Sequence, residues 1–106
     1  MKTKHTPGEW IPCKIIGSYD YSVRTEKRPQ LIIIPVRITE VNKGIQAKLE
    51  AEAEANAKLI AAAPDMFTAL MVARAHLEYA IEFGAGAGGE SKAIEIIDKA
   101  IKKATL

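Results

Sequence analysis

The sequence predicts an α+β fold in which an N-terminal antiparallel β-meander of three or four strands precedes three C-terminal helices with a proline corner. Before residue 41, β-branched and alternating stretches are interrupted by Pro and Gly, whereas after residue 45 the helix formers Ala, Glu, Leu and Lys predominate. The chain has 106 residues, of which 48% are hydrophobic, enough for a modest core. We therefore expect a single domain over 1–106, with a β region at 1–41 and a helical region at 45–106.

Two strands are expected in the first 25 residues. The first covers 10–16, where Pro12 removes a backbone donor and favours a place at the edge of the sheet. After a Gly-Ser turn, residues 19–25 alternate with the period of two that is typical of a half-buried strand. The expected faces of this second strand are Tyr19, Tyr21 and Val23 on one side and Asp20, Ser22 and Arg24 on the other.

The third expected strand lies within residues 30–39. Residues 31–34 are β-branched and apolar enough for a central strand, but Pro35 interrupts the hydrogen-bond ladder. We therefore expect a bend or bulge at Pro35, with residues 36–39 continuing the strand.

The helical half is organised around Pro64. A first helix is expected from about residue 45 to near Ala63, because Pro64 disfavours helical geometry in the residue before it. Pro64 suits the first position of a second helix, so the two helices should meet at a tight corner. The second helix should reach about Phe83, where Gly84 can supply a left-handed cap, and a third is expected at about 91–105. The apolar positions of the first helix fall on one side: Leu49, Ala53, Leu59, Ile60 and Ala63.

Charge and cysteine content narrow the possible partners and location. The formal net charge is only +2, so we do not expect nucleic acid or a membrane surface as partner. Residues 1–48 nevertheless hold nine Lys and Arg against four acids, so an anionic partner would meet the β half. Cys13 is the sole cysteine, which excludes an internal disulfide and fits a reducing cytoplasm. Since no apolar run approaches the roughly 20 residues that span a bilayer, we expect a soluble protein of the host cytoplasm.

The sequence shows no arrangement of residues that indicates catalysis. Residues 84–89 match the pattern G-x-G-x-x-G, but this dinucleotide motif requires a preceding strand and here follows a helix. His5 and His76 have no carboxylate or cysteine at ligand spacing, and no nucleophile lies beside a base. We therefore expect a protein that is not an enzyme and that holds no cofactor or metal.

Asn56 is the candidate binding residue of the first helix, since it lies on the apolar side, seven residues after Leu49 and four before Ile60. A buried amide without partners costs about 1–3 kcal/mol, so other groups must meet its donors and its acceptor. Asn56 then bonds either the strand backbone or a second copy of the chain, or it binds a ligand where helix meets sheet.

Other candidate ligand-binding residues come from the β half. Arg37, Arg24 and Arg28 could contact phosphate groups from the sheet, and Tyr19 or Tyr21 could stack on a base. Taken singly, each is more often a solvated or packing residue, so their role depends on whether the fold brings them together.

Two stretches of the chain resemble a group of small bacteriophage and prophage proteins. These are His5-Thr6-Pro7-Gly8-x-Trp10 and the run from Glu54 to Asp65, which reads EANAKLIAAAPD. The group typically has an H-T-P-G-P-W opening and the run E-A-N-A-R-L-I-A-A-A-P-E-L-L-E-A-L. This chain departs from it at Glu9, at Lys58 and at Met66-Phe67-Thr68. The resemblance implies a phage origin.

In layout the chain is also similar to anti-Thoeris phage proteins, which sequester cyclic ADP-ribose signals and combine an N-terminal antiparallel sheet with C-terminal helices. This resemblance implies a homo-oligomeric counter-defence protein that binds and sequesters a cyclic nucleotide or cyclic ADP-ribose-type signal. Two alternatives stay open: an inhibitor that binds a host defence protein directly, as anti-CRISPR proteins do, and a phage accessory protein of another role.

Overall fold

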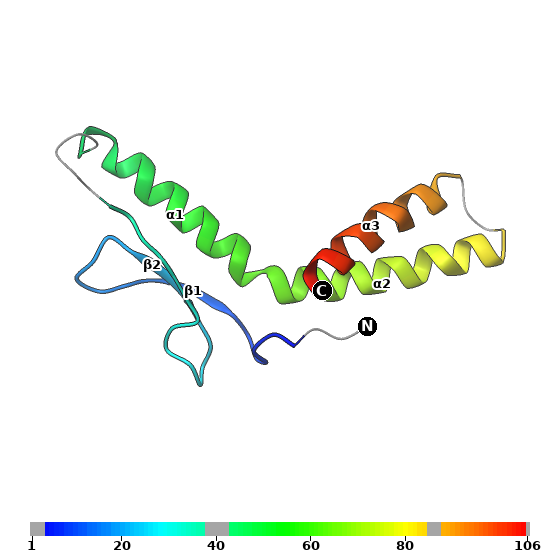
Figure 1. Cartoon of the computed structure of the whole chain (residues 1–106), viewed down its shortest axis with the longest axis horizontal. Helices are drawn as coiled ribbons and strands as arrows, with labels where there is room; N and C mark the ends of the chain where they lie inside the picture. Colours follow the sequence, from blue (N-terminus) through cyan, green and yellow to red (C-terminus); the bar gives the residue numbers. More distant parts are fainter. Residues whose placement is uncertain (1–3, 38–42, 85–87, 106) are drawn as a thin grey trace. The chain divides into compact units, whose positions relative to one another are not determined.

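The computed structural model describes residues 4–37, 43–84 and 88–105. Its strands are β1 (Ile11–Lys14), β2 (Tyr21–Arg24) and β3 (Ile32–Ile34), and its helices are η1 (Lys43–Ile45), α1 (Gln46–Ala61), α2 (Ala63–Glu82) and α3 (Glu90–Thr105) (Figure 1). This is the expected α+β order of three antiparallel strands followed by three helices. The chain forms two compact units, one of Pro7–Ala63 and one of Pro64–Leu106 with Met1–Thr6. The single domain expected over 1–106 stays a prediction.

The sheet of the first unit is an antiparallel meander with the order β1-β2-β3. Val23 of β2 lies between Pro12 of β1 and Ile32 of β3, which fixes the register. As predicted, the strand that carries Pro12 is at an edge. The prediction of a central strand at 31–34 is wrong, because β2 occupies the centre and β3 is the other edge. β3 ends at Ile34, before Pro35. Residues 38 and 39 of the expected continuation lie outside the described residues.

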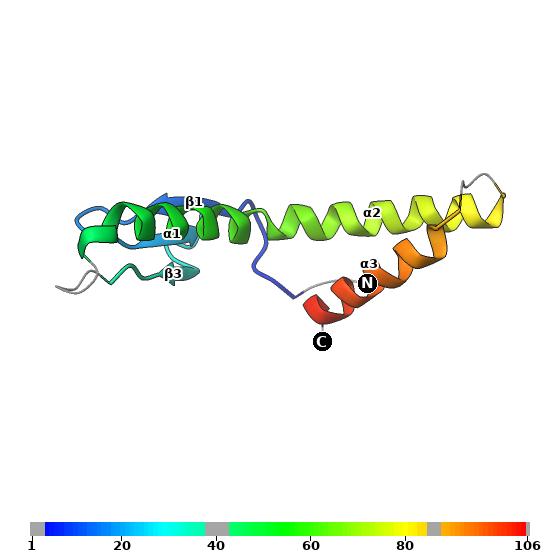
Figure 2. The ribbon, with the colours of Figure 1, turned by 90° about the horizontal axis from the view of Figure 1, so that it is seen from above.

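Helix α1 lies along one face of this sheet (Figures 1 and 2). Its buried residues are Ala53, Ala57 and Ala61, spaced four apart, and Ala57 is completely buried in a cluster with Val23. Alanine has no side chain beyond Cβ, so three alanines on one side of the helix allow its backbone to approach the strands closely. Larger side chains close the edges of this contact: Trp10, Tyr21, Ile34 and Ile60.

The apolar side predicted for this helix is rotated relative to the observed one. The prediction placed Asn56 inward with Leu59, but Asn56 is exposed and Leu59 is 61% exposed. The observed side runs through Ala53, Ala57 and Ala61, and its centre lies roughly one residue, or about 100°, from Asn56. The expectation of a buried amide at Asn56 is therefore wrong. Residue size explains the difference, because the close contact with the sheet admits alanine and excludes the bulkier leucine.

The first helix ends slightly earlier than the position of the proline suggests. Ala62 separates α1 from α2 and keeps α-helical angles, with φ −80° and ψ −9°, and its N–H bonds the carbonyl of Lys58 at 3.0 Å. Pro64 is then the second residue of α2, where a missing backbone donor costs little. Proline thus marks the start of the second helix, as expected.

In the second unit, α3 follows α2 and runs back in roughly the opposite direction (Figures 1 and 2). Arg74 of α2 bonds both carboxylate oxygens of Asp98 on α3, at 2.5 and 3.3 Å. Ile101 is buried, whereas no described residue of α2 is. Gly84 closes the C-terminus of α2 with φ +64°, which confirms the expected left-handed cap. No helix in the described ranges combines the length and apolar character that crossing a membrane requires.

Candidate functional site

A hollow of about 190 Å³ opens between the chain after β3 and the exposed flank of α1. We call it the helix hollow. Its wall on the sheet side follows from Pro35, which ends β3 and turns the next residues away from the ladder. The N–H of Val36 donates to the Asp20 carboxylate at 2.8 Å, which fixes the segment that carries Arg37. Its lining residues are Ile34, Pro35, Val36, Arg37, Leu49, Glu52, Ala53 and Asn56.

The polar groups of the helix hollow come from both of its sides. Glu52 and Asn56 are one helical turn apart on α1, so both face the same hollow, and Arg37 lies across from them. All three side chains are exposed. Asn56 and Arg37 thus line the same hollow at the surface, where helix and sheet join. The Asn56 amide was predicted to be buried, but it is exposed.

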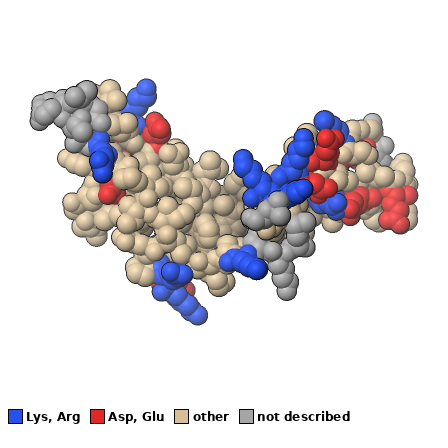
Figure 3. All heavy atoms as spheres, in the orientation of Figure 1, with Lys and Arg blue, Asp and Glu red and all other residues tan. Residues whose placement is uncertain are grey.

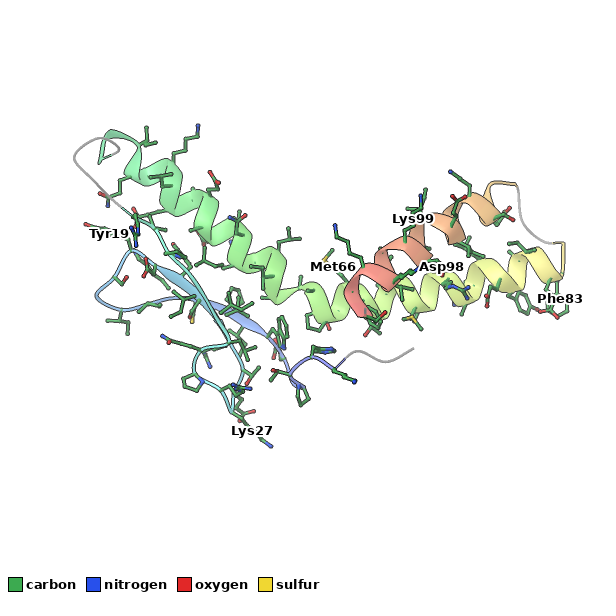
Figure 4. All side chains as sticks on the ribbon, viewed as in Figure 1. Tyr19, Lys27, Met66, Phe83, Asp98 and Lys99 are labelled. Atoms are coloured by element: carbon green, nitrogen blue, oxygen red, sulfur yellow. The ribbon has the colours of Figure 1, made fainter. Side chains whose placement is uncertain are left out.

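A second hollow, of about 650 Å³, lies at the turn between β1 and β2, and we call it the turn hollow. Tyr19 is part of its wall and is 46% exposed (Figure 4). Gly17 has φ +79° in this turn, a conformation that glycine adopts without strain. Val36 contributes to the walls of both hollows. Lys14 also lines the turn hollow, and its ammonium lies 3.3 Å from the Glu50 carboxylate of α1.

The fold separates the remaining predicted residues from these hollows. Arg24 lines a third hollow of about 460 Å³, beside Glu9 and Lys27. Arg28 is exposed in the turn after β2, where its backbone N–H donates to the Thr25 hydroxyl at 3.0 Å. Tyr21 packs against the core cluster. The structure therefore brings Arg37 and Asn56 together and places Tyr19 in the adjoining hollow, but it does not gather Arg24, Arg28 and Tyr21 there.

The helix hollow offers three kinds of polar contact. The Arg37 guanidinium can hold a phosphate through paired N–H groups, the Glu52 carboxylate can accept hydrogen bonds from sugar hydroxyls, and the Asn56 amide can both donate and accept. The sequence prediction did not include Glu52. A signal for it was present, since Glu52 precedes Asn56 by four residues and therefore shares its helical face.

No group of three or more His, Cys, Asp or Glu residues in the described part of the chain could hold a metal ion. Cys13 is half-buried on β1, and its thiol lies 3.1 Å from the Ser22 hydroxyl of β2. His5 and His76 are both exposed.

The fold and these hollows define a small α+β protein with surface hollows lined by polar residues between its sheet and its first helix. Over residues 1–105 the chain matches the family described as Salmonella phage P22 protein Y8K6, and it belongs to this phage protein family. This confirms the expected phage relationship. No curated protein matches the chain. No solved structure matches it either.

Proposed function

We propose that this phage protein acts by binding rather than by catalysis, and that it sequesters an anionic nucleotide-type signal of host immunity in the host cytoplasm. The ligand class is a cyclic nucleotide or a cyclic ADP-ribose-type molecule. The observation that supports the proposal is the meeting of Arg37, Glu52 and Asn56 around one hollow. A guanidinium, a carboxylate and an amide correspond to the phosphate, the ribose and the base edge of a nucleotide.

The size of the hollows bears on where the ligand lies. Ligand sites usually measure about 300–1,000 Å³, so the helix hollow of about 190 Å³ is too small to enclose a whole nucleotide. The turn hollow, at about 650 Å³, is within that range, and Val36 lines both. We therefore place the phosphate and sugar near Arg37 and Glu52, and a base against the exposed ring of Tyr19 in the turn hollow.

Recovery of bound ligand tests the proposal. The full chain is incubated with cyclic ADP-ribose and, separately, with cyclic di-AMP, freed of unbound ligand and heat-denatured, and the released molecules are identified by mass spectrometry. We expect intact ligand from at least one incubation. A chemically altered nucleotide would show an enzyme instead, and the absence of retained ligand from both would overturn sequestration of these two signals.

A matched pair of variants locates the site. Arg37→Ala should weaken binding of the ligand by about 10- to 150-fold, because a charge-assisted phosphate contact is worth about 1.5–3 kcal/mol. Arg28→Ala removes the same charge from an exposed position away from both hollows, so its retention should equal that of the wild type. Equal losses in both variants would indicate a general charge effect and contradict a site at Arg37.

A second candidate function is direct inhibition of a host defence protein, and the exposed Ile33 on the edge strand β3 favours it. Tyr21 and Val23 pack toward α1, so the intervening Ser22 and its cross-strand neighbours Cys13 and Ile33 face away from that helix. Ile33 is 50% exposed on this face. If no nucleotide is retained, loss of host-protein binding in an Ile33→Lys variant would support this function.

A further inference from the structure

The face of α2 opposite α3 carries an apolar stripe. Its residues are separated by three and four positions in turn, a spacing that keeps them on one side of a helix. Val72, Tyr79 and Phe83 are 52%, 61% and 62% exposed, and Phe83 points away from α3 at the end of the helix (Figure 4). We call the following residues the outer stripe: Ala69, Val72, His76, Tyr79 and Phe83.

The outer stripe is ordered along its length and nearly free of charge. The rings of Tyr79 and Phe83 pack at a centroid distance of 4.5 Å with their planes tilted by 38°. The N–H of Phe83 bonds the Tyr79 carbonyl at 3.0 Å, so the helical pattern continues to Phe83. Ala73, Ala75 and Ala80 flank the stripe and allow close approach of another helix. None of the five residues of the stripe is Asp, Glu, Lys or Arg.

We propose that the outer stripe binds a second copy of this chain, with the two α2 helices antiparallel and their two-fold axis at His76. The stripe is small at its N-terminal end and large at its C-terminal end. Antiparallel pairing about His76 sets Phe83 against the second copy's Ala69, and Tyr79 beside the second copy's Val72 and Ala73. Away from the two His76 side chains at the axis, large side chains then face smaller ones, which is how well-packed interfaces fill their volume.

Charge selects the antiparallel arrangement. Acidic side chains gather at the C-terminal end of α2 (Figure 3), where Glu82 lies three residues after Tyr79 and flanks the stripe. A parallel pair would bring the two copies of Glu82 together and make them repel. An antiparallel pair about His76 separates them by about 18 Å. This is longer than the Debye length at physiological salt, so their repulsion is largely screened.

The area of the outer stripe suits a reversible dimer. Aromatic side chains bury about 150–250 Å² each, so two copies of a stripe with this exposure cover on the order of 1,000 Å². This is near the lower limit for a specific interface, so the dimer should dissociate on dilution. The stripe belongs to a different unit of the chain from the two hollows, so this proposal does not depend on the proposed function.

Light scattering during size-exclusion chromatography of the full chain, over a range of concentrations, tests the dimer. The wild type should shift from monomer to dimer as concentration rises, and Tyr79→Glu should stay monomeric at every concentration. The matched control is Ile96→Glu, since Ile96 is 59% exposed on α3 and lies outside the stripe. A wild type that stays monomeric would overturn the proposal, as would equal loss of the dimer in both variants.

Disulfide cross-linking tests the orientation of the two helices. In a Cys13→Ser background, His76→Cys places the two thiols at the axis of an antiparallel pair and should give a cross-linked dimer on oxidation. Phe83→Cys places them about 21 Å apart along the helices and should give none. Equal cross-linking at both positions would show a parallel pair, and no cross-link at His76→Cys would contradict an axis there.

Discussion

Arg74 links the two long helices of the second unit through its side chain. It bonds Asp98 of α3 through Nε and Nη2, and it pairs with Glu78 on its own helix. The hydrogen bond from Arg74 holds the pKa of Asp98 below its ordinary value of 3.8, and the bonds to Asp98 and Glu78 raise the pKa of Arg74. Both partners are partly exposed, so solvent screens the pair.

The lowered pKa of Asp98 predicts how stability changes in acid. A carboxylate with a lowered folded-state pKa contributes stability above its unfolded pKa and loses it as pH falls through the folded value. The wild type should therefore lose urea resistance as pH falls below about 3.8. Asp98→Asn should lose less over the same range, when urea midpoints are compared with those at pH 7. Parallel pH profiles for both proteins would show that the pair contributes nothing measurable.

Asn56 shows what the sequence can and cannot settle at the residue scale. Helical spacing correctly places it near the contact of helix and sheet, where it lines one hollow together with Arg37. Its burial does not follow, because residue hydrophobicity alone does not determine which side of the helix faces the sheet. The helix instead presents its smallest residues to the sheet, and Leu59 lies in solvent. Patterns in one segment do not reveal how closely another segment approaches it.

At the scale of elements, the close contact of α1 with the sheet rests on Ala57. This residue is completely buried against Val23, so a larger side chain would have to displace a strand. Ala57→Leu should lower the free energy of unfolding by about 1–3 kcal/mol through overpacking. Ala55→Leu changes an exposed alanine of the same helix and should alter it by less than about 0.5 kcal/mol. Similar urea midpoints for the two variants would contradict the described packing.

The end of α2 depends on the left-handed backbone of Gly84. A Cβ there meets no neighbouring atom within 4 Å. A substitution of Gly84 therefore costs stability through the backbone conformation and not through a steric clash. Gly84→Ala should destabilise the protein by about 1–2 kcal/mol, since L-residues disfavour positive φ. Gly44→Ala is the control, because Gly44 has equal space and no positive φ. Equal melting temperatures for the two variants would show that this cap carries no strain.

Element boundaries were predictable mainly where backbone chemistry sets them. Pro12 indicated the edge strand and Pro64 the first turn of α2, whereas the strand expected to continue past a bend at Pro35 ends at Ile34. Strand order was not predictable in the same way. The isoleucines of β3 predict a central strand, yet β3 is at an edge and Ile33 is half exposed. The burial of a strand depends on which neighbouring strands and helices the whole fold supplies.

At the scale of the whole molecule, the two proposed activities lie in different units. Both hollows belong to Pro7–Ala63, and the outer stripe belongs to Pro64–Leu106. Ligand retention and dimerisation should therefore be separable. Tyr79→Glu should retain as much cyclic ADP-ribose as the wild type, and Arg37→Ala should dimerise like the wild type. A loss of ligand in the monomeric variant would show instead that the site needs both copies.

Two-dimensional amide NMR of the full chain during titration with cyclic ADP-ribose, and then with cyclic di-AMP, tests the central claim most directly. The account predicts saturable shifts at residues 34–37 and 49–56 and at the Asn56 side-chain amide, with smaller ones around Tyr19. Signals of α3 should stay in place. Shifts confined to residues 7–11 and 24–27 would place the ligand in the third hollow, and no shifts with either ligand would contradict a nucleotide-type site between Arg37 and Asn56.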